Sequence, residues 1–273
     1  IGAKAKRFKE LRKKQGFVRA TAAANLYVAA FLLPKVGGAP SGPSARTVPT
    51  TEELWMALNQ GKMRQAMVDA PKAARRARAF HWPLEFPDIM QRGGFDVVLG
   101  NPPWEVIQLD EREFFAAVAP ELASLSGAKR KSAIAKLEHS NPPFFELYET
   151  EKRFVASVTE FARGSGRFEL TAKGKINTYA LFSNLSYDLR KATGSAGLVV
   201  PLGIAYSDTT SDFFMHALES RHIASIISFD EIKRWFSGAK DNQSFCLITF
   251  RENVEQTKFI NRISSIEEMS HPE

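Results

Sequence analysis

Short apolar runs alternate with helical patterns in the second half of this 273-residue chain. Each run has the length of a strand and a composition dominated by apolar side chains. The runs are FDVVL at 95–99, AGLVVP at 196–201, IASIISF at 223–229 and SFCLITF at 244–250. Amphipathic patterns at 177–194 and 208–221 predict helices between them. Strands that alternate with helices favour an open α/β sheet with helical cover.

The first part of the chain is predicted to be mainly helical. The spacing predicts one helix over residues 4–33, and the segment 36–49 has the composition of a Gly/Pro/Ser linker. Thr50 with Glu53 has capping-box spacing, which predicts a helix that Gly61 ends. We therefore predict two domains. They are a mainly helical segment at 1–79 and an α/β region at 80–273 with a helical insertion at about 105–175.

Positive charge is concentrated in two predicted helices of this first part, in KAKRFKELRKK and in PKAARRARAF. The whole chain has 37 Lys and Arg against 30 Asp and Glu, a formal charge of +7. Such a balance fits a polyanionic partner, and it also fits an ordinary soluble protein. The charged half of the first helix is either a solvated face or an arm that faces phosphates.

The composition excludes several classes of protein. A hydrophobic fraction of 44% and a charged fraction of 25% are typical of a folded globular chain. The single cysteine, Cys246, excludes an internal disulfide framework and a cysteine zinc cluster, and its apolar neighbours predict a buried, unreactive thiol. The apolar stretch at 25–34 is too short to span a bilayer. We expect a cytoplasmic protein that does not enter the membrane.

The tripeptide Asn-Pro-Pro occurs twice, at 101–103 and at 141–143. The second copy follows a helical pattern, which predicts that Asn141 is a turn or N-cap residue and that the prolines begin the next helix. The first copy follows the predicted strand in GGFDVVLG. Open α/β sheets bind their ligands beyond the carboxyl ends of the strands, so the first copy is the candidate for chemistry.

The tetrapeptide Asn101-Pro102-Pro103-Trp104 predicts a rigid corner. A residue before proline is pushed to an extended conformation, and each proline has a fixed φ and no N–H. The corner presents the side-chain oxygen of Asn101 and the carbonyl of Pro102 beside the flat ring of Trp104. Two acceptors beside an aromatic ring suit a planar molecule with an exocyclic NH2 group, such as adenine. The alternative is a plain strand-ending turn with Trp104 in the core.

The segment GGFDVVLGNPPWE resembles the catalytic motif of the amino-methyltransferases that methylate adenine in DNA at N6. With HWPLEFPDIM before it, it is similar to the large adenine methylases of type IIG restriction–modification and related phage-defence systems. The similarity continues through GRFELTAKGKINTYALF, GLVVPLGIAYSDTT and WFSGAKDNQSFCLITF, and it covers roughly residues 80 to 250. The resemblance implies a partial Rossmann-like, S-adenosylmethionine-dependent methyltransferase sheet that acts on double-stranded DNA.

The resemblance also implies roles for individual residues. Asn101, Pro102, Pro103 and Trp104 are the catalytic tetrapeptide, in which Asn101 and the Pro102 carbonyl accept hydrogen bonds from the target amine. Trp104 stacks on the adenine after that base has left the duplex. Phe236 occupies the place of a second aromatic against the base, or else it is a core phenylalanine before a strand. The chemistry needs no metal ion.

For the cofactor, S-adenosylmethionine, the resemblance places Asn101, Asn177 and Tyr179 on the binding side. The family also holds its cofactor with a Gly-rich loop after a first strand, and the sequence contains no such loop. The G-x-G at 164–166 follows a helical pattern instead. The chain begins with Ile1 rather than Met. We therefore expect a later portion of a larger enzyme, whose upstream part supplies the first strands and completes the cofactor site.

Two other functions fit the same residues. A basic α/β module could dock nucleic acid without chemistry, with the corner as a simple turn. The corner could also serve an amino group of RNA or of a glutamine side chain in a protein, because the related N-P-P-Y signature is shared by such enzymes. The flanking HWPLEFP favours DNA.

Overall fold

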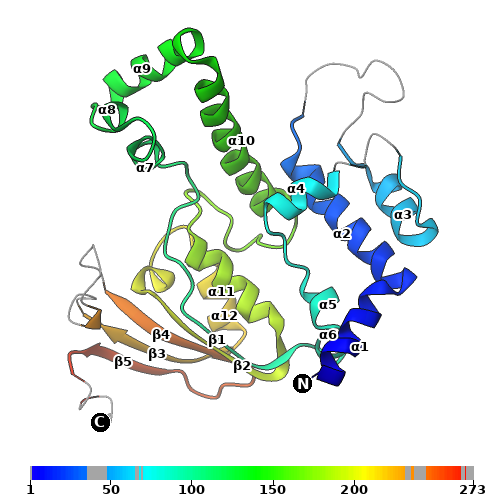
Figure 1. Ribbon diagram of the computed structural model, residues 1–273. Helices are drawn as coiled ribbons and strands as arrows, with labels where there is room; N and C mark the ends of the chain where they lie inside the picture. The colour runs from blue at the N-terminus through cyan, green and yellow to red at the C-terminus, as the bar shows by residue number, and fades with distance from the viewer. Residues whose placement is uncertain are drawn as a thin grey trace. The chain divides into compact units, whose positions relative to one another are not determined.

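The structure, a computed structural model, describes residues 2–35, 48–64, 68, 70–230, 235–236, 244–265 and 268. It is a mixed α/β protein with a five-stranded sheet (Figure 1). The helices are α1 (Gly2–Lys13), α2 (Gln15–Leu32), α3 (Thr51–Gln60), α4 (Ala70–Arg76), α5 (Trp82–Glu85), α6 (Pro87–Met90), α7 (Glu111–Ala116), α8 (Pro120–Ala123), α9 (Gly127–Ser140), α10 (Pro142–Gly164), α11 (Thr178–Leu189) and α12 (Ser211–Glu219), with a 3₁₀ helix at Leu202–Ala205. The strands are β1 (Phe95–Gly100), β2 (Arg190–Pro201), β3 (Ile223–Phe229), β4 (Phe245–Arg251) and β5 (Lys258–Ile263). The predicted α/β fold class is confirmed.

The chain divides into two compact units. The helical unit comprises Ile1–Leu84 and Gln108–Phe161, and the sheet unit comprises Glu85–Ile107 and Ala162–Glu273. The helices of the predicted insertion therefore pack with the N-terminal helices as one unit, and the predicted domain limits at 1–79 and 80–273 stay predictions. Within the described residues, every helix is too short or too polar to cross a membrane.

The sheet has the strand order β1-β2-β4-β3-β5. β1 is parallel to β2, and β3 is parallel to β5, whereas β4 runs antiparallel to both β2 and β3. Parallel neighbours need a crossover connection, and α11 lies in the connection between β1 and β2. The carboxyl ends of β1 and β2 consequently meet at one edge of the sheet.

One face of the sheet packs against α11 and α12, which provide the main hydrophobic core. In β2 every second residue points to this face, and side chains of the strands β3 and β4 pack beside them in the same core. The core contains Tyr179 and Ala180 of α11, Phe213 and Ala217 of α12, and Ala196, Leu198, Val200, Ile223, Ile226, Cys246, Ile248 and Phe250 of the strands, with Ile204 of the 3₁₀ helix.

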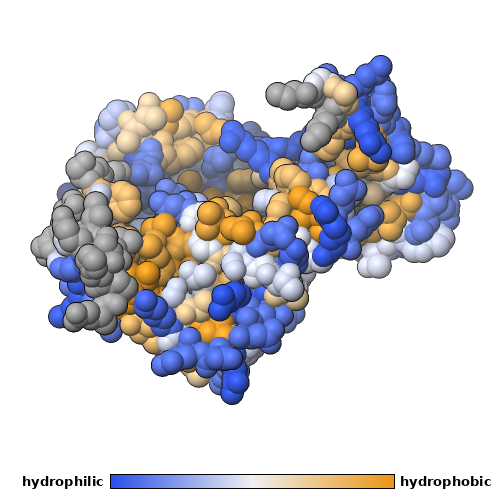
Figure 2. Space-filling model, turned by 90° about the horizontal axis from the view of Figure 1, so that it is seen from below, coloured by the Kyte–Doolittle hydropathy of each residue, from blue (hydrophilic) through white to orange (hydrophobic). Residues whose placement is uncertain are grey.

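The opposite face of the sheet is partly exposed. Val199 of β2 and Leu247 of β4 are half-buried there in a cluster with Phe229 and Phe245. On the edge strand β1, Leu99 keeps 78% of its surface exposed. Figure 2 shows apolar surface, in orange, between the polar side chains of the face seen there. An edge strand with exposed apolar side chains can pair with a further strand.

The limits of two predicted helices differ from those observed, and one observed strand was not predicted. The helix predicted at 4–33 is two helices, because the backbone of Lys14 is extended (φ −64°, ψ 137°). The helix predicted at 177–194 ends at Leu189, and β2 begins at the next residue. β5 was not predicted at all, because Lys258–Ile263 is short and carries two cations. Elsewhere the predicted strands and helices are present within a few residues.

Pairing with β1 explains why β2 begins so early. Phe95 pairs with Arg190 and Val97 with Ser195, so β2 carries extra residues between these two pairs. Gly194 lies in this bulge, and a Cβ atom there would come 2.5 Å from the carbonyl oxygen of Phe95. Only glycine permits so close an approach of two backbones. The tertiary pairing therefore overrides the helical spacing of the preceding residues.

Local capping in the helical unit follows the sequence. The carboxylate of Glu53 accepts a hydrogen bond from the backbone N–H of Thr50 at 2.8 Å, and Gly61 ends α3 with a φ of 66°. The side chain of Asn141 accepts a bond from the N–H of Phe144 at 3.4 Å, and α10 begins at Pro142. The predicted structural role of the second Asn-Pro-Pro copy is thereby confirmed.

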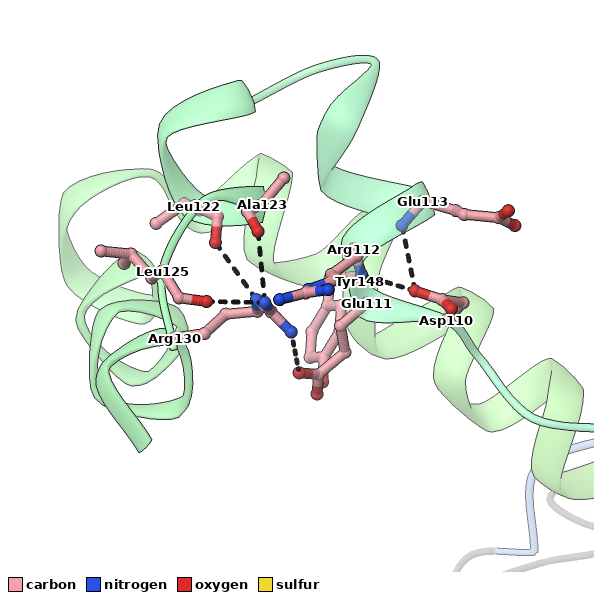
Figure 3. Close-up of polar contacts among 9 residues, drawn as sticks. All are labelled: Asp110, Glu111, Arg112, Glu113, Leu122, Ala123, Leu125, Arg130 and Tyr148. Carbon is pink, nitrogen blue, oxygen red and sulfur yellow. Dashed lines mark hydrogen bonds and ion pairs between the residues drawn. The ribbon is translucent and has the colours of Figure 1, made fainter. Parts of the chain in front are cut away.

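A buried arginine organises the short helices α7 to α9 (Figure 3). The guanidinium of Arg130 donates to the carbonyl oxygens of Leu122, Ala123 and Leu125 at 3.1, 3.2 and 2.7 Å. It also lies 3.8 Å from the carboxylate of Glu111, which accepts a hydrogen bond from the Tyr148 hydroxyl at 2.9 Å. The side chain thus ties the end of α8 to α7 and α10.

Cys246 is fully buried in the main core, and burial raises the pKa of its thiol to about 12. Because the thiolate is the reactive form, we expect native protein at pH 8 to resist alkylation by iodoacetamide, and urea-unfolded protein to react fully. Mass spectrometry of the two samples measures this. Rapid modification of the native protein would show that β4 opens readily.

Candidate active site

The first Asn-Pro-Pro copy forms a corner directly after β1. The side chain of Asn101 is exposed, and within the described part of the chain it makes no hydrogen bond. Pro102 is buried, which anchors the corner, while Pro103 is exposed. The side chain of Asn101 is therefore held at the carboxyl end of a strand and is exposed to solvent.

Trp104 lies partly buried where the corner returns to the sheet. Its indole N–H donates to the carbonyl oxygen of Val199 in β2 at 3.4 Å. Its ring lies 6.4 Å from the ring of Phe245 in β4, with 33° between the planes. The indole is neither fully in the core nor free in solvent. It rests on the carboxyl end of β2, beside the exposed corner.

Phe236 approaches the same edge of the sheet from the far end of the sequence. Its ring lies 5.7 Å from the ring of Phe245, at 60°, and 47% of its surface is exposed. Phe245 therefore has Trp104 and Phe236 as two aromatic neighbours. The two residues that the family resemblance assigned to one base thus lie near the same phenylalanine, and neither of them is fully buried.

A short backbone bridge fixes the exit from the corner. The N–H of Thr178 donates to the carbonyl oxygen of Glu105 at 2.8 Å, and the N–H of Ile107 donates to that of Ile176 at 2.9 Å. Val106 and Asn177 form an isolated antiparallel β-bridge between these bonds. The segment after Trp104 is thus paired with the residues that begin α11.

Thr178, which the sequence did not single out, adds the closest polar contacts to the corner. Its hydroxyl oxygen lies 2.7 Å from the carbonyl oxygen of Pro103 and 3.0 Å from that of Glu105. It also accepts from the backbone N–H of Glu105 at 3.0 Å. The one hydroxyl proton is shared between two carbonyls, and the side chain holds the peptide groups on both sides of Trp104.

Asn177 and Tyr179, predicted on the cofactor side, have partners within the protein. Asn177 caps α11, since its side-chain oxygen accepts from the N–H of Tyr179 at 3.2 Å, and its amide donates to the carbonyl oxygen of Trp104 at 3.5 Å. Tyr179 is 6% exposed, and burial raises the pKa of its hydroxyl. Their contact with a cofactor stays a prediction. The observed hydrogen bonds of Asn177 instead cap α11 and link it to the backbone of Trp104.

The glycine-containing segment and the two residues predicted on the cofactor side have these surroundings in the structure. The G-x-G at 164–166 lies at the end of α10 rather than after a strand, and Gly166 has a φ of 69°. Asn177 is engaged in capping, and Tyr179 is in the core. In the parts of the chain that the structure describes, no group of three His, Cys, Asp or Glu side chains could hold a metal ion.

Comparison with known proteins identifies the family. The model of a family described as Eco57I restriction-modification methylase matches residues 43–133 and 140–236, which include the corner, the start of α11 and Phe236. A search of curated proteins gives no match. The matched residues make up more than half of the chain. The chain therefore belongs to the Eco57I restriction-modification methylase family.

Proposed function

We propose that this protein is the catalytic region of a DNA methyltransferase that methylates adenine at N6, and that Asn101 to Trp104 are its active site. The observation that supports the proposal is the exposed amide of Asn101, which lies between a strand end and two prolines and is free of hydrogen bonds to described residues. The family supports a methyltransferase of a restriction–modification system. A role in phage defence belongs to the same proposal.

The corner would activate a poor nucleophile. The amino lone pair of adenine is delocalised into the ring, so N6 attacks weakly. Hydrogen bonds from its two N–H groups to the Asn101 oxygen and the Pro102 carbonyl favour a tetrahedral nitrogen with a localised lone pair. The rigid corner preorganises both acceptors before the base arrives, which is the largest source of catalysis in sites of this kind.

The methyl donor expected for the family is S-adenosylmethionine, which supplies an electrophilic methyl carbon on a sulfonium. With the donor bound, the bond from nitrogen to that carbon would form as the carbon–sulfur bond breaks, and the extra proton on nitrogen would leave to solvent. The target base reaches the corner only after it flips out of the duplex. Trp104 and Phe236 offer aromatic surface for the flipped base, and stacking contributes about 1–3 kcal/mol per base.

The remaining cofactor contacts are proposed to come from a part of the polypeptide upstream of Ile1. The exposed edge strand β1, with Leu99 78% exposed, supports this proposal because it can accept another parallel strand. Calorimetric titration of the 273-residue chain with S-adenosylmethionine provides a direct check. Tight one-to-one binding by this chain alone would contradict it.

Product analysis tests the base and the reaction. The full-length protein is incubated with mixed-sequence duplex DNA and S-adenosylmethionine that carries a labelled methyl group, and the digested nucleosides are separated by mass spectrometry. We expect label in N6-methyladenine. Label in a methylated cytosine would reject the adenine assignment, and label in added RNA or protein but not in DNA would reject DNA as the substrate.

Thr178 is expected to act as a positioning residue. Valine in its place keeps the shape but removes the contacts to Pro103 and Glu105, so kcat should fall about tenfold through misplacement of the corner, while KM for DNA changes little. Thr178→Ser keeps the hydroxyl and should restore kcat. Equal losses in the valine and serine variants would show that the hydroxyl alone does not position the corner.

A further inference from the structure

Helix α1 carries charge that packing does not explain. Residues 2–35 contain nine Lys and Arg and a single acidic residue, Glu10. Among the side chains of α1 that the structure describes, Lys6, Arg7, Lys9 and the last-turn cations are exposed, and only Leu11 is partly buried. A helix normally buries one apolar face against its neighbours. The exposed faces of α1 are available to a partner outside the chain.

The cations of α1 repel one another. Lys6, Lys9 and Lys13 recur at helical spacing on one face, where like charges three or four residues apart destabilise a helix. Within the described residues none of these three lysines forms an ion pair. A polyanion bound along this face would relieve the repulsion. The three side chains span about 10 Å of the helix axis, which covers successive phosphates of one DNA strand.

Two grooves beside α2 extend the positive surface. One groove, of about 270 Å³, is lined by Arg12 of α1 and Arg75 of α4, together with the polar side chains of Thr21 and Asn25. The second groove, of about 400 Å³, is lined by Lys13, Arg19 and Lys62. Val18 and Ala22 line both grooves. The adjacent residues Arg12 and Lys13 therefore connect the charge of α1 to cations from three other segments.

We propose that α1 and these two grooves bind the phosphate backbone of double-stranded DNA without reading its sequence. The choice of DNA rests on the proposed function. Helices α1 and α2 lie in residues 1–42, outside the family match, whereas Lys62 and Arg75 of the grooves lie inside it. The exposed faces of α1 carry mostly cations, with Phe8 39% exposed under the guanidinium of Arg12, which fits phosphates better than the apolar interior of a membrane.

The salt dependence of DNA binding tests the surface. The triple variant Lys6→Gln, Lys9→Gln, Lys13→Gln is compared with the matched control Lys129→Gln, Lys131→Gln, Lys136→Gln, which removes three exposed lysines from α9. Anisotropy titrations use a labelled duplex at several salt concentrations, without a methyl donor. The slope of log K against log salt should become shallower by about 2.7 in the first variant, because each lost phosphate contact removes about 0.9. The control should keep the wild-type slope.

Two outcomes would overturn the proposal. One is a wild-type slope in the α1 variant, and the other is an equal change in the α9 control. A third arm titrates vesicles of anionic lipid: loss of vesicle binding in the α1 variant with an unchanged DNA slope would assign the surface to membranes instead. Circular dichroism confirms that the variants are folded. Since no methyl donor is present, the result stands whether or not N6-methyladenine is formed in the activity assay.

Discussion

Replacing Asn101 with alanine is expected to lower kcat for methyl transfer to DNA about a hundred- to a thousandfold, the usual cost of one preorganised hydrogen-bonding group at a reacting centre. The side chain is exposed and is not bonded to any described residue, so its removal breaks no structural contact there. The loss should therefore appear in kcat with the thermal unfolding midpoint unchanged. Labelled methyl incorporation under saturating DNA and donor measures the effect.

The second Asn-Pro-Pro copy supplies the matched control. Asn141→Ala changes the same residue type in the same tripeptide, but its side chain caps α10 through the N–H of Phe144. We expect a loss of about 1 kcal/mol in the free energy of unfolding and an unchanged kcat. If Asn101→Ala retains wild-type kcat, or if Asn141→Ala loses activity as strongly, the corner after β1 is not the catalytic centre.

These two tripeptides also show what the sequence can predict. The element before each copy, a strand at 95–99 and a helix before 141, predicted opposite roles. The structural role of Asn141 is confirmed, and the exposure of Asn101 beyond β1 agrees with the arrangement expected for a ligand site. The cap formed by Thr50 and Glu53 was also predictable, because its hydrogen bonds join residues within a stretch of four.

Contacts between distant segments were not predictable in this way. Thr178 holds peptide groups that lie 73 to 75 residues earlier, and no local spacing marks it for that role. The early start of β2 follows from its pairing with Phe95, whereas the sequence there has helical spacing. The role of Phe236 was predicted through the family resemblance alone, since its own neighbours would equally suit a core residue, and that role stays a prediction.

The contacts of Arg130 could not be predicted from local sequence either. A cation in a basic helical stretch is normally predicted to be a solvated surface charge. In the structure Arg130 is 7% exposed and bonds three carbonyl groups around the end of α8 (Figure 3). Its neighbour Tyr148 is also buried, and burial with the hydrogen bond to Glu111 raises the pKa of the phenol to about 12. The protonated phenol of Tyr148 therefore contributes to the free energy of unfolding. That contribution is fully present below pH 10 and is lost as the pH rises through about 12.

Replacing Arg130 with methionine is expected to lower the free energy of unfolding of the helical unit by about 3 kcal/mol. Methionine fills much of the volume, but the carbonyl oxygens of Leu122, Ala123 and Leu125 lose their donor and Glu111 loses its cation. Urea unfolding followed by far-UV circular dichroism measures the change. Lys131→Met, on the exposed side of the same helix, is the control and should stay within about 0.5 kcal/mol of wild type. Equal stabilities of the two variants would mean that water replaces the guanidinium, and that the short helices α7 to α9 are held by their apolar contacts alone.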